Sequence, residues 1–329
     1  MTDKPTNEEF LRQADPMRRE LLAHCYRMMG SVHDAEDLVQ ETYLRAWRAY
    51  DGFEGRSSLR TWLYHIATNA CLTALDSRTR RPLPTGLGAP STEATAPLVQ
   101  DKEVLWLEPV PDALAGAAGD DPASIVTSRE SIRLALIAAL QHLPPRQRAV
   151  LVLRDVLKWR AAEVAEALET STAAVNSILQ RARAQLDQVQ PSRDDPVEPL
   201  SPEQRAQLER YVAAFENYDF ESLVEQFTKD AIWEMPPFVG WYQGPETILE
   251  LMRTQCPAKG PGDLKLVPTA ANGQPAFAMY LREDGVYRQF SLMVVTFSGE
   301  RISHGVMFFE RKLFETFGLP EVLEASAAK

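Results

Sequence analysis

The segment LPPRQRAVLVLRDVLKWRAAEVAEALETSTAAVNSILQRARAQL, residues 143–186, contains two short helical patterns separated by a tight turn. Apolar residues recur at helical spacing and form the expected inner faces, Ala161, Val164, Ala165 and Leu168 in the first helix and Val175, Ile178, Leu179, Ala182 and Leu186 in the second. Between them, residues 169–172, ETST, supply hydroxyl side chains that can cap the second helix. The pattern predicts a helix-turn-helix unit.

The second helix of this unit has an outward face that suits DNA. Short polar side chains near its start can reach base edges, and arginines further along can contact phosphates. An ordinary antiparallel helix pair with a polar outer face is the alternative interpretation, and the turn contains no glycine. The residues that we assign to DNA reading are Thr172, Ala173, Asn176, Ser177, Gln180, Arg181 and Arg183.

Residues 58–82, SLRTWLYHIATNACLTALDSRTRRP, predict another helix that ends in a basic run and a proline. One face carries an ordinary core stripe, made of Leu59, Leu63, Ile66, Ala67, Ala70 and Ala74. Burial does not explain the stripe beside it, which contains Trp62, His65, Asn69, Asp76 and Arg80. The alternative is a solvated flank with one half-buried tryptophan.

Residues 34–47, DAEDLVQETYLRAW, predict a helix with two different faces. Its core stripe contains Ala35, Leu38, Val39, Thr42, Ala46 and, just beyond, Tyr50. The opposite face mixes acids with large apolar groups, a combination that is typical of a protein contact; its members are Glu36, Asp37, Gln40, Tyr43, Leu44 and Trp47. Alternatively, a third layer of the protein's own core covers Trp47.

The chain is predicted to have an all-α half followed by an α+β domain. Proline, glycine and alanine mark a linker between the two helical parts, and strand patterns rich in β-branched and aromatic residues begin after residue 230, at 231–235, 265–269, 275–282, 286–298 and 301–310. The resulting parts are helical residues 1–82, an acidic linker at 83–127, helical residues 128–190, a short linker at 191–200 and an α+β domain at 201–329.

Composition sets broad limits on the function. The 329 residues are 45% hydrophobic and 25% charged, and no run of 18 apolar residues occurs, so we expect a cytoplasmic protein without membrane insertion. Cys25, Cys71 and Cys256 lack metal-type spacing, so we expect free thiols and no metal. The net charge of −11 is uneven, because residues 129–190 hold nine basic and six acidic side chains while residues 83–128 hold one and seven. The overall charge therefore does not exclude a nucleic-acid partner.

The chain resembles an extracytoplasmic-function (ECF) sigma factor of the sigma-70 family. Three motifs carry the resemblance, in this order: DAEDLVQETYLRAW, then TWLYHIATNACLTAL with RRP, then LPPRQRAVLVLRD with its helix-turn-helix. VLWLEPVPD at 104–112, MPPF at 235–238 and LVPTAANGQPAF at 266–277 resemble the subgroup with a SnoaL-like extension. The resemblance implies two all-α sigma domains, numbered 2 and 4, and a cone-shaped α+β domain. It implies no catalysis and no cofactor.

The resemblance also implies partners and roles. The mixed face of residues 36–47 would dock on the β′ clamp of RNA polymerase core, and the second helical part would contact the β flap and read the −35 promoter element. The first helical part would hold the melted −10 element, with stacking by Trp62, base reading by Asn69, a base pocket in the loop 53–58, and phosphate contacts from arginines including Arg78. The residues assigned to the −10 element are Phe53, Arg56, Ser57, Ser58, Arg60, Trp62, His65, Asn69, Arg80 and Arg81. The acidic linker suits an RNA mimic threaded through polymerase, or a merely solvated spacer.

SnoaL-like domains enclose a cavity, and some relatives are cyclases, isomerases or hydrolases. Candidate acid–base and aromatic residues here are Trp233, Glu234, Phe238, Trp241, Tyr242, Tyr287 and His304, although plain core is the commoner role of such aromatics. The domain is interpreted as a regulatory module, a sensor of a small ligand or, least favoured, an enzyme.

We therefore predict an alternative sigma factor that binds polymerase core and promoter DNA, is modulated by its C-terminal domain and is a candidate for control by an anti-sigma factor. The alternatives are a ligand-responsive helix-turn-helix regulator and a cyclase-like or isomerase-like enzyme. The order of DAEDLVQETYLRAW before TWLYHIATN favours the first interpretation, because a repressor has no use for a clamp-docking helix.

Overall fold

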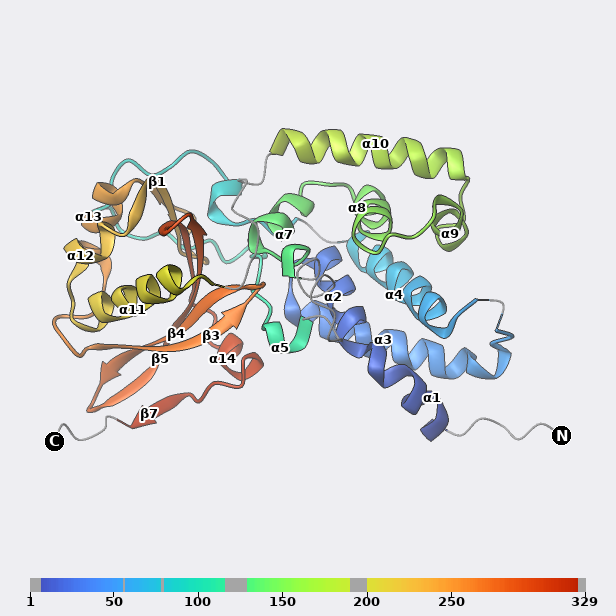
Figure 1. Ribbon diagram of the computed structural model, residues 1–329, viewed down its shortest axis with the longest axis horizontal. Coiled ribbons are helices and arrows are strands. Elements are labelled where there is room, and N and C mark those ends of the chain that lie inside the picture. The colour runs from blue at the N-terminus through green and yellow to red at the C-terminus, as the bar shows by residue number, and fades with distance from the viewer. Residues whose placement is uncertain (1–6, 56, 78–79, 116–128, 190–199, 325–329) are drawn as a thin grey trace. The chain divides into compact units, whose positions relative to one another are not determined.

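The computed structural model describes residues 7–55, 57–77, 80–115, 129–189 and 200–324 (Figure 1). The chain divides into two compact units, the first made of residues 1–81 and 107–193 and the second of residues 82–106 and 194–329. The predicted linker at 83–127 is therefore shared. Residues 82–106 belong to the C-terminal unit, residues 107–115 belong to the helical unit, and residues 116–127 lie outside the described part.

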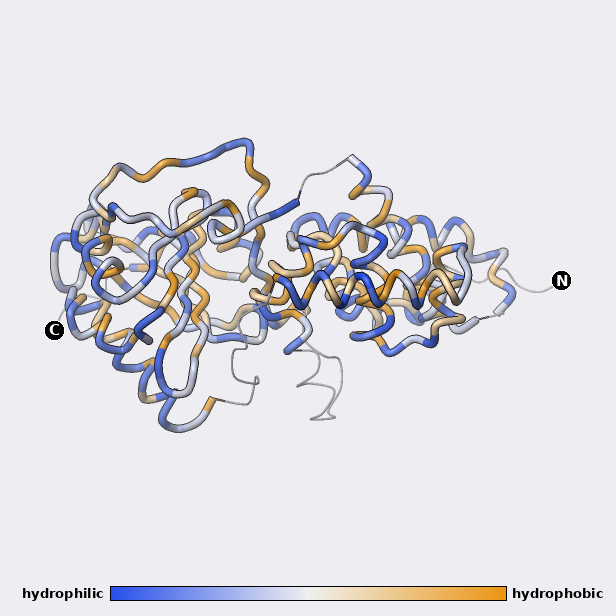
Figure 2. The backbone as a smooth tube through the Cα atoms, turned by 90° about the horizontal axis from the view of Figure 1, so that it is seen from above, coloured by the Kyte–Doolittle hydropathy of each residue, from blue (hydrophilic) through white to orange (hydrophobic). Residues whose placement is uncertain are grey.

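The first unit consists of helices joined by loops, with no named strand among its described residues. Its α-helices are α1 (Asn7–Ala14), α2 (Arg18–Met29), α3 (Val32–Ala49), α4 (Leu59–Leu75), α5 (Asp112–Ala115), α7 (Leu134–Leu140), α8 (Pro145–Leu151), α9 (Ala161–Ala167) and α10 (Thr172–Val189). A π-helical turn, Val152–Val156, follows α8, and short 3-10 turns lie at Asp15–Met17 and Tyr50–Gly52. Figure 2 shows polar and apolar residues alternating along these helices, as amphipathic helices require.

Local signals in the sequence explain where α3 and α4 begin. Gly30 ends α2 with a φ of 68°, and Ser31 Oγ accepts a hydrogen bond from the backbone N of Asp34 at 3.1 Å. Ser58 Oγ caps α4 in the same way, through the backbone N of Thr61. Helices α2, α3 and α4 then pack together, and the predicted core residues Ala35, Val39, Ala46, Leu63 and Ala67 are fully buried.

The helix-turn-helix is formed by α9 and α10. Ser171 Oγ accepts a hydrogen bond from the backbone N of Ala174 at 3.1 Å and so caps α10, as predicted. Glu169 adopts a φ of 49° in the turn, a conformation that glycine adopts more easily. The inner-face residues Val175, Leu179 and Ala182 are buried.

Two buried arginines tie α2 to the segment that carries α7 and α8. Arg148 of α8 donates to the carbonyl oxygen of Met28, and Arg27 of α2 donates to Ser131 Oγ at 2.6 Å. Burial lowers the pKa of each guanidinium to about 10, so both stay protonated at neutral pH. Tyr64 of α4 meets Trp159 edge-on at 5.8 Å between ring centroids.

The second unit is a curved sheet covered by helices, and this α+β class confirms the predicted one. The sheet order is β2-β1-β6-β5-β4-β3, with β7 paired to β5 and β1 parallel to β6. Its strands are β1 (Phe227–Glu234), β2 (Trp241–Gln243), β3 (Leu264–Ala271), β4 (Gln274–Glu283), β5 (Val286–Ser298), β6 (Arg301–Phe308) and β7 (Val322–Glu324). Its α-helices are α11 (Pro202–Glu216), α12 (Phe220–Val224), α13 (Pro245–Gln255) and α14 (Lys312–Thr316).

Helices α11 and α13 pack on the sheet, against β3 and β1 respectively, over a core rich in aromatic residues. Trp233 in that core lies directly over Gly305 of β6, where an added Cβ would come within 2.6 Å of the indole ring. Glycine is therefore required at position 305. Among the described residues, no helix combines the length and the apolar character needed to cross a bilayer.

Candidate polymerase and nucleic-acid interface

The mixed face of α3 leaves two large apolar side chains in solvent. Leu44 and Trp47 are 47% and 49% exposed, and Asp37 and Gln40 beside them are also exposed. Tyr43 is more enclosed, because its hydroxyl donates to the carbonyl oxygen of Ala14 at 2.9 Å and burial raises the pKa of its phenol to about 12. Together with half-buried Glu36, these residues form a surface that we call the docking patch: Glu36, Asp37, Gln40, Tyr43, Leu44 and Trp47. No described part of the helical unit covers Trp47.

An aromatic stack precedes and enters α4. The rings of Phe53 and Trp62 lie 4.8 Å apart at 30°, and those of Tyr50 and Phe53 lie 6.2 Å apart at 11°. Phe53 comes from the loop before α4 and Trp62 from its first turn, so the cap at Ser58 fixes one ring relative to the other. Trp62 is only half-buried, which leaves aromatic surface for a further stacked ring.

His65 and Asn69 continue the same face of α4, one and two turns beyond Trp62, and both are half-buried. The Nε2 atom of His65 is buried and has no hydrogen-bond partner among the described residues. The three side chains therefore form one stripe on α4, as the sequence predicted, which we call the reading stripe. Of the loop residues assigned with it, Ser57 is exposed, Ser58 caps α4, and Arg56 lies outside the described residues, as does Arg78 beyond α4.

The three described arginines assigned to the −10 element, Arg60, Arg80 and Arg81, each have a partner for their guanidinium group. Arg60 makes hydrogen bonds of 2.7–3.1 Å to the carboxylate of Glu20, and it lies 4.9 Å from the centre of the Tyr64 ring. The hydrogen bond that Arg60 donates to Glu20 raises the pKa of Arg60. Arg80 contacts His142 Nδ1 at 2.9 Å.

Arg81 is the clearest departure, because only 12% of its side chain is exposed. Its Nη2 lies 2.7 Å from Asp34 Oδ2, and its Nη1 lies 3.9 Å from Glu108 Oε1. Glu108 belongs to the second part of the predicted linker and accepts hydrogen bonds from Ser31 Oγ at 2.7 Å and His33 Nδ1 at 2.9 Å. Burial alone would raise the pKa of Glu108, but these hydrogen bonds and the charges of His33 and Arg81 outweigh it and lower the pKa.

The outward face of α10 is exposed at every residue that the sequence assigned to it. Arg183 is the one member seen to form an ion pair within the described chain, with Asp155 at 2.6 Å. The remaining six side chains form an exposed, mostly polar surface, which we call the α10 face: Thr172, Ala173, Asn176, Ser177, Gln180 and Arg181.

In the C-terminal unit, two of the predicted acid–base residues meet. His304 Nε2 lies 2.7 Å from Glu234 Oε1, and the other carboxylate oxygen accepts a hydrogen bond from the backbone N of Thr85 at 2.7 Å. Glu234 is completely buried, so a segment of the linker covers this pair.

The other predicted pocket residues do not form an open pocket. Trp233 and Tyr242 are buried in the core, Phe238 packs edge-on to Phe309, and Trp241 donates its indole N–H to the carbonyl oxygen of Gly88 at 2.8 Å. Tyr287 is engaged elsewhere, with its hydroxyl donating to the carbonyl oxygen of Gly262. Of the seven candidates, the structure therefore brings Glu234 and His304 together, whereas core packing and linker atoms surround the aromatic ones.

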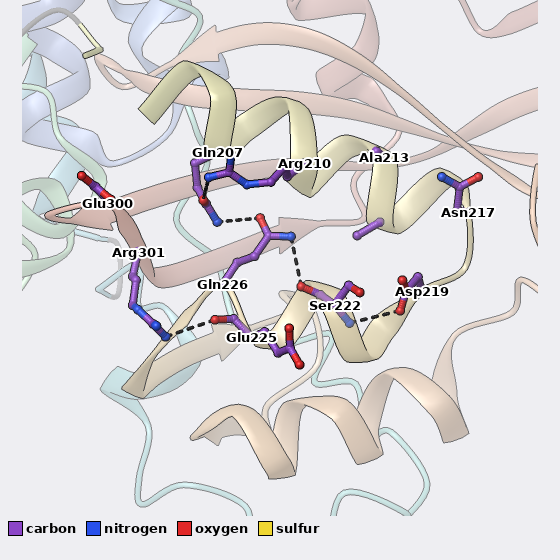
Figure 3. Close-up of a pocket in the computed structure, with 11 residues that line it drawn as sticks. Gln207, Arg210, Ala213, Asn217, Asp219, Ser222, Glu225, Gln226, Glu300 and Arg301 are labelled. Carbon is purple, nitrogen blue, oxygen red and sulfur yellow. Dashed lines mark hydrogen bonds between the residues drawn. The ribbon is translucent and has the colours of Figure 1, made fainter. Parts of the chain in front are cut away.

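A groove does open on a different part of this unit (Figure 3). Its volume is about 590 Å³, and it lies between α11, α12 and the start of β6. Gln207 Nε2 donates to Gln226 Oε1 across it at 2.7 Å, and Arg301 donates to the carbonyl oxygen of Glu225. Asp219 caps α12 by accepting a hydrogen bond from the backbone N of Ser222. These polar groups satisfy one another, so the groove shows no set of side chains converging on a ligand.

Sequence reasoning missed the acids that neutralise the arginines and the contacts of the linker. Glu20 and Glu108 are distant in sequence from the arginines they bind. Their negative charge was the only feature of the sequence that could indicate such a pairing. The described residues contain no group of three or more metal-ligating side chains.

Three family models match the chain: Sigma-70 region 2 over residues 15–81, Sigma-70, region 4 over residues 133–186, and SnoaL-like domain over residues 208–311. The ECF RNA polymerase sigma factor SigG of Mycobacterium tuberculosis (strain ATCC 25618 / H37Rv) is 60% identical over 316 residues, which span 96% of this chain and 85% of that protein. SigJ of the same strain is 30% identical over 257 residues, 75% of this chain and 73% of that protein. The crystal structure of the Mycobacterium tuberculosis sigma factor SigJ has the same fold, with a TM-score of 0.60, 23% identity, and coverage of 94% of this chain and 100% of that one.

Proposed function

Because the chain belongs to the extracytoplasmic-function (ECF) family of RNA polymerase sigma factors, we propose that it directs core polymerase to a particular set of promoters through two DNA-reading surfaces and one docking patch. Sigma factors act in transcription initiation and are not themselves enzymes. The site of action is then the cytoplasm, where polymerase meets the chromosome.

The observation that carries the proposal is the reading stripe of Trp62, His65 and Asn69 beside Phe53. Base pairing and stacking hide base faces within a duplex, so a half-exposed tryptophan on a helix is of little use to a protein that reads only duplex DNA. A melted strand offers both faces and Watson–Crick edges. We assign stacking to Trp62 and Phe53, and base-edge contacts to Asn69 and His65.

The α10 face serves the complementary task, because duplex DNA presents base edges in a major groove wide enough for a helix. Asn176 and Gln180 carry amides that pair with adenine edges, and Arg181 suits guanine or phosphate. The docking patch offers polymerase two exposed apolar side chains, Trp47 and Leu44. Tryptophan in particular is often found at the centre of protein interfaces. Each contact is modest alone, so specificity arises when polymerase presents both surfaces at once.

The C-terminal domain is proposed to modulate this activity rather than to catalyse a reaction. Its acid–base pair, Glu234 and His304, is covered by the chain itself, which favours a regulatory role over an enzyme acting on an outside substrate. A chain ending near residue 190 should then differ from the full chain in promoter output. Equal output of the two forms would remove the regulatory role.

Run-off transcription tests the main proposal. Core polymerase with the full chain should give discrete start sites on genomic fragments, and core polymerase alone should give none of them. The chain without polymerase should bind those fragments weakly. Tight, sequence-specific binding without polymerase would instead favour a plain helix-turn-helix regulator, and it would count against the sigma-factor mechanism.

A further inference from the structure

The linker segment 82–106 lies along the C-terminal domain as a bound peptide would. Its backbone contacts begin at Thr85, whose N–H donates to Glu234, and continue at Ser91, whose N–H donates to the carbonyl oxygen of Trp241 at 2.7 Å. Further along, the backbone N of Val239 donates to the carbonyl oxygen of Val99 at 3.0 Å, and Gln100 forms an antiparallel bridge with Phe238. The segment is thus held at several points between Thr85 and Gln100.

Side chains of the domain complete this site. Gln255 Nε2 donates to the carbonyl oxygens of Thr95 and Ala96 at 3.3 and 3.2 Å, at the end of α13. Ala94 is 1% exposed and belongs to the same core cluster as Trp233, and Leu98 packs against that cluster. Backbone hydrogen bonds combined with small side-chain pockets are the usual way in which a domain recognises an extended peptide.

We propose that the C-terminal domain is a peptide-binding module whose ligand is the chain's own segment 82–106, and that this domain and polymerase compete for that segment. The inference rests on the proposed function, because it assumes that the linker has a place in the polymerase complex. While segment 82–106 is bound, the chain between Arg81 and Leu107 cannot extend along another surface. The held state is therefore an inactive state, and release of the segment precedes productive engagement of polymerase.

The site has a polar anchor that explains why the held state is specific. Glu234 is 0% exposed, and a buried carboxylate requires hydrogen-bond donors. His304 and the backbone N–H of Thr85 supply the two that the structure shows. When the linker dissociates, the Glu234 carboxylate loses the hydrogen bond from Thr85 and needs water or another donor in its place. Dissociation therefore costs free energy, which stabilises the bound state of the linker.

A disulfide across the contact provides a direct test. An added Cβ at Gly240 would lie 2.9 Å from Ser91 Oγ, and Gly240 does not have a positive φ, so cysteines fit at both positions. The double variant S91C/G240C, oxidised with diamide, should lose at least about tenfold in run-off transcription with core polymerase, and dithiothreitol should restore it. Cys25 and Cys71 are buried beside one another and burial raises the pKa of Cys256, so wild type treated with diamide measures any effect of the native thiols.

The single variants S91C and G240C, treated identically, are the controls and should change less than twofold. A cross-linked double variant that transcribes as well as its reduced form would overturn the proposal. Failure of the cross-link to form, judged by mass spectrometry, would also overturn it, because the two positions would not be adjacent in solution. Loss of transcription by the reduced double variant and by wild type alike would instead contradict the proposed sigma-factor function.

A loosening variant tests the opposite direction. Thr85→Pro removes the N–H that binds Glu234, whereas Thr85→Ala keeps it and is the matched control. At limiting polymerase, Thr85→Pro should raise promoter output about twofold or more and Thr85→Ala should leave it unchanged. Equal output from the two variants would count against the linker contact as a brake.

Discussion

The two helices proposed to contact DNA in this sigma factor, α4 and α10, differ in how their charged side chains are paired. On and after α4, Arg60 is paired with Glu20, and Arg81 is paired with Asp34 and Glu108. On α10, Arg181 is exposed, and only Arg183 of the assigned residues has an ion-pair partner among those described. The contrast fits the two forms of DNA that they would meet, because duplex DNA exists before polymerase arrives, whereas an unpaired strand exists only after melting.

The largest expected effect concerns the docking patch, which lies on α3, in the same bundle as α4 and away from α10 in sequence. Trp47→Ala should weaken binding to core polymerase by about 2–4 kcal/mol, roughly 30- to 1000-fold, because a tryptophan at the centre of an interface contributes about that much. Fluorescence anisotropy with labelled chain measures the change. Val322→Ala, in a residue 42% exposed on the C-terminal unit, is the matched control and should bind normally. Equal losses would show that exposed apolar surface in general, and not this patch, governs association.

The next effect separates melting from duplex reading. Trp62→Ala should lower transcription from duplex promoters by about 5- to 150-fold, since stacking on one base contributes about 1–3 kcal/mol. A template melted beforehand across the −10 element should recover part of that loss if Trp62 also helps to open the strands. Asn69→Ala, by contrast, should change base preference within the −10 element. No change in opening or preference for either variant would remove the role assigned to the reading stripe.

A smaller effect is expected on α10. Asn176→Ala should cost about 1 kcal/mol or somewhat more at one base pair of the −35 element, roughly fivefold in output, and should relax the preference at that position. Gln188→Ala, in an exposed residue of the last turn outside the α10 face, should leave the preference unchanged. Transcription from a library of −35 variants provides the measurement. A template melted beforehand across the −10 element should not restore output with Asn176→Ala. Restored output would contradict the assignment of Asn176 to duplex reading.

The smallest expected effect concerns the stability of the helical unit, which contains α4. Glu108 has a pKa below its ordinary value of 4.5, so its ionised form is favoured by folding. Its contribution is therefore present above pH 4.5 and is lost as the pH falls through the lowered pKa. Glu108→Gln should reduce the free energy of unfolding at pH 7 by about 1 kcal/mol, and this difference should shrink steadily below pH 4.5 in thermal melts. Glu93→Gln, an exposed linker variant, should follow wild type at every pH.

Much of the fold follows from local sequence patterns. The strand patterns at 231–235, 265–269, 275–282, 286–298 and 301–310 correspond to β1, β3, β4, β5 and β6, because long runs of β-branched and aromatic residues carry a strong signal. The strands β2 and β7 have three residues each and were not predicted, since a pattern needs greater length to be recognised. The cap at Ser171 was predicted from the ETST turn, but the left-handed Glu169 beside it was not.

The site was predictable where one helix carries it and unpredictable where distant segments meet. Trp62, His65 and Asn69 share a face because of helical spacing alone, and so do the residues of the α10 face. Arg81 meets Asp34 and Glu108 across 47 and 27 positions of sequence, so no local pattern shows that its charge is neutralised. The linker was predicted to be an RNA mimic or a solvated spacer. Its contacts with the C-terminal domain were not predicted, because many of them use backbone atoms, which leave almost no trace in residue type.

Permanganate reactivity of promoter thymines tests the central claim most directly, because the oxidant attacks unstacked thymines. Promoter DNA should become reactive across the −10 element only when core polymerase and this chain are both present, and Trp62→Ala should weaken that signal. Reactivity induced by the chain alone, or none with both proteins at a promoter that the pair transcribes, would contradict the claim that α4 holds a melted strand while polymerase supports it.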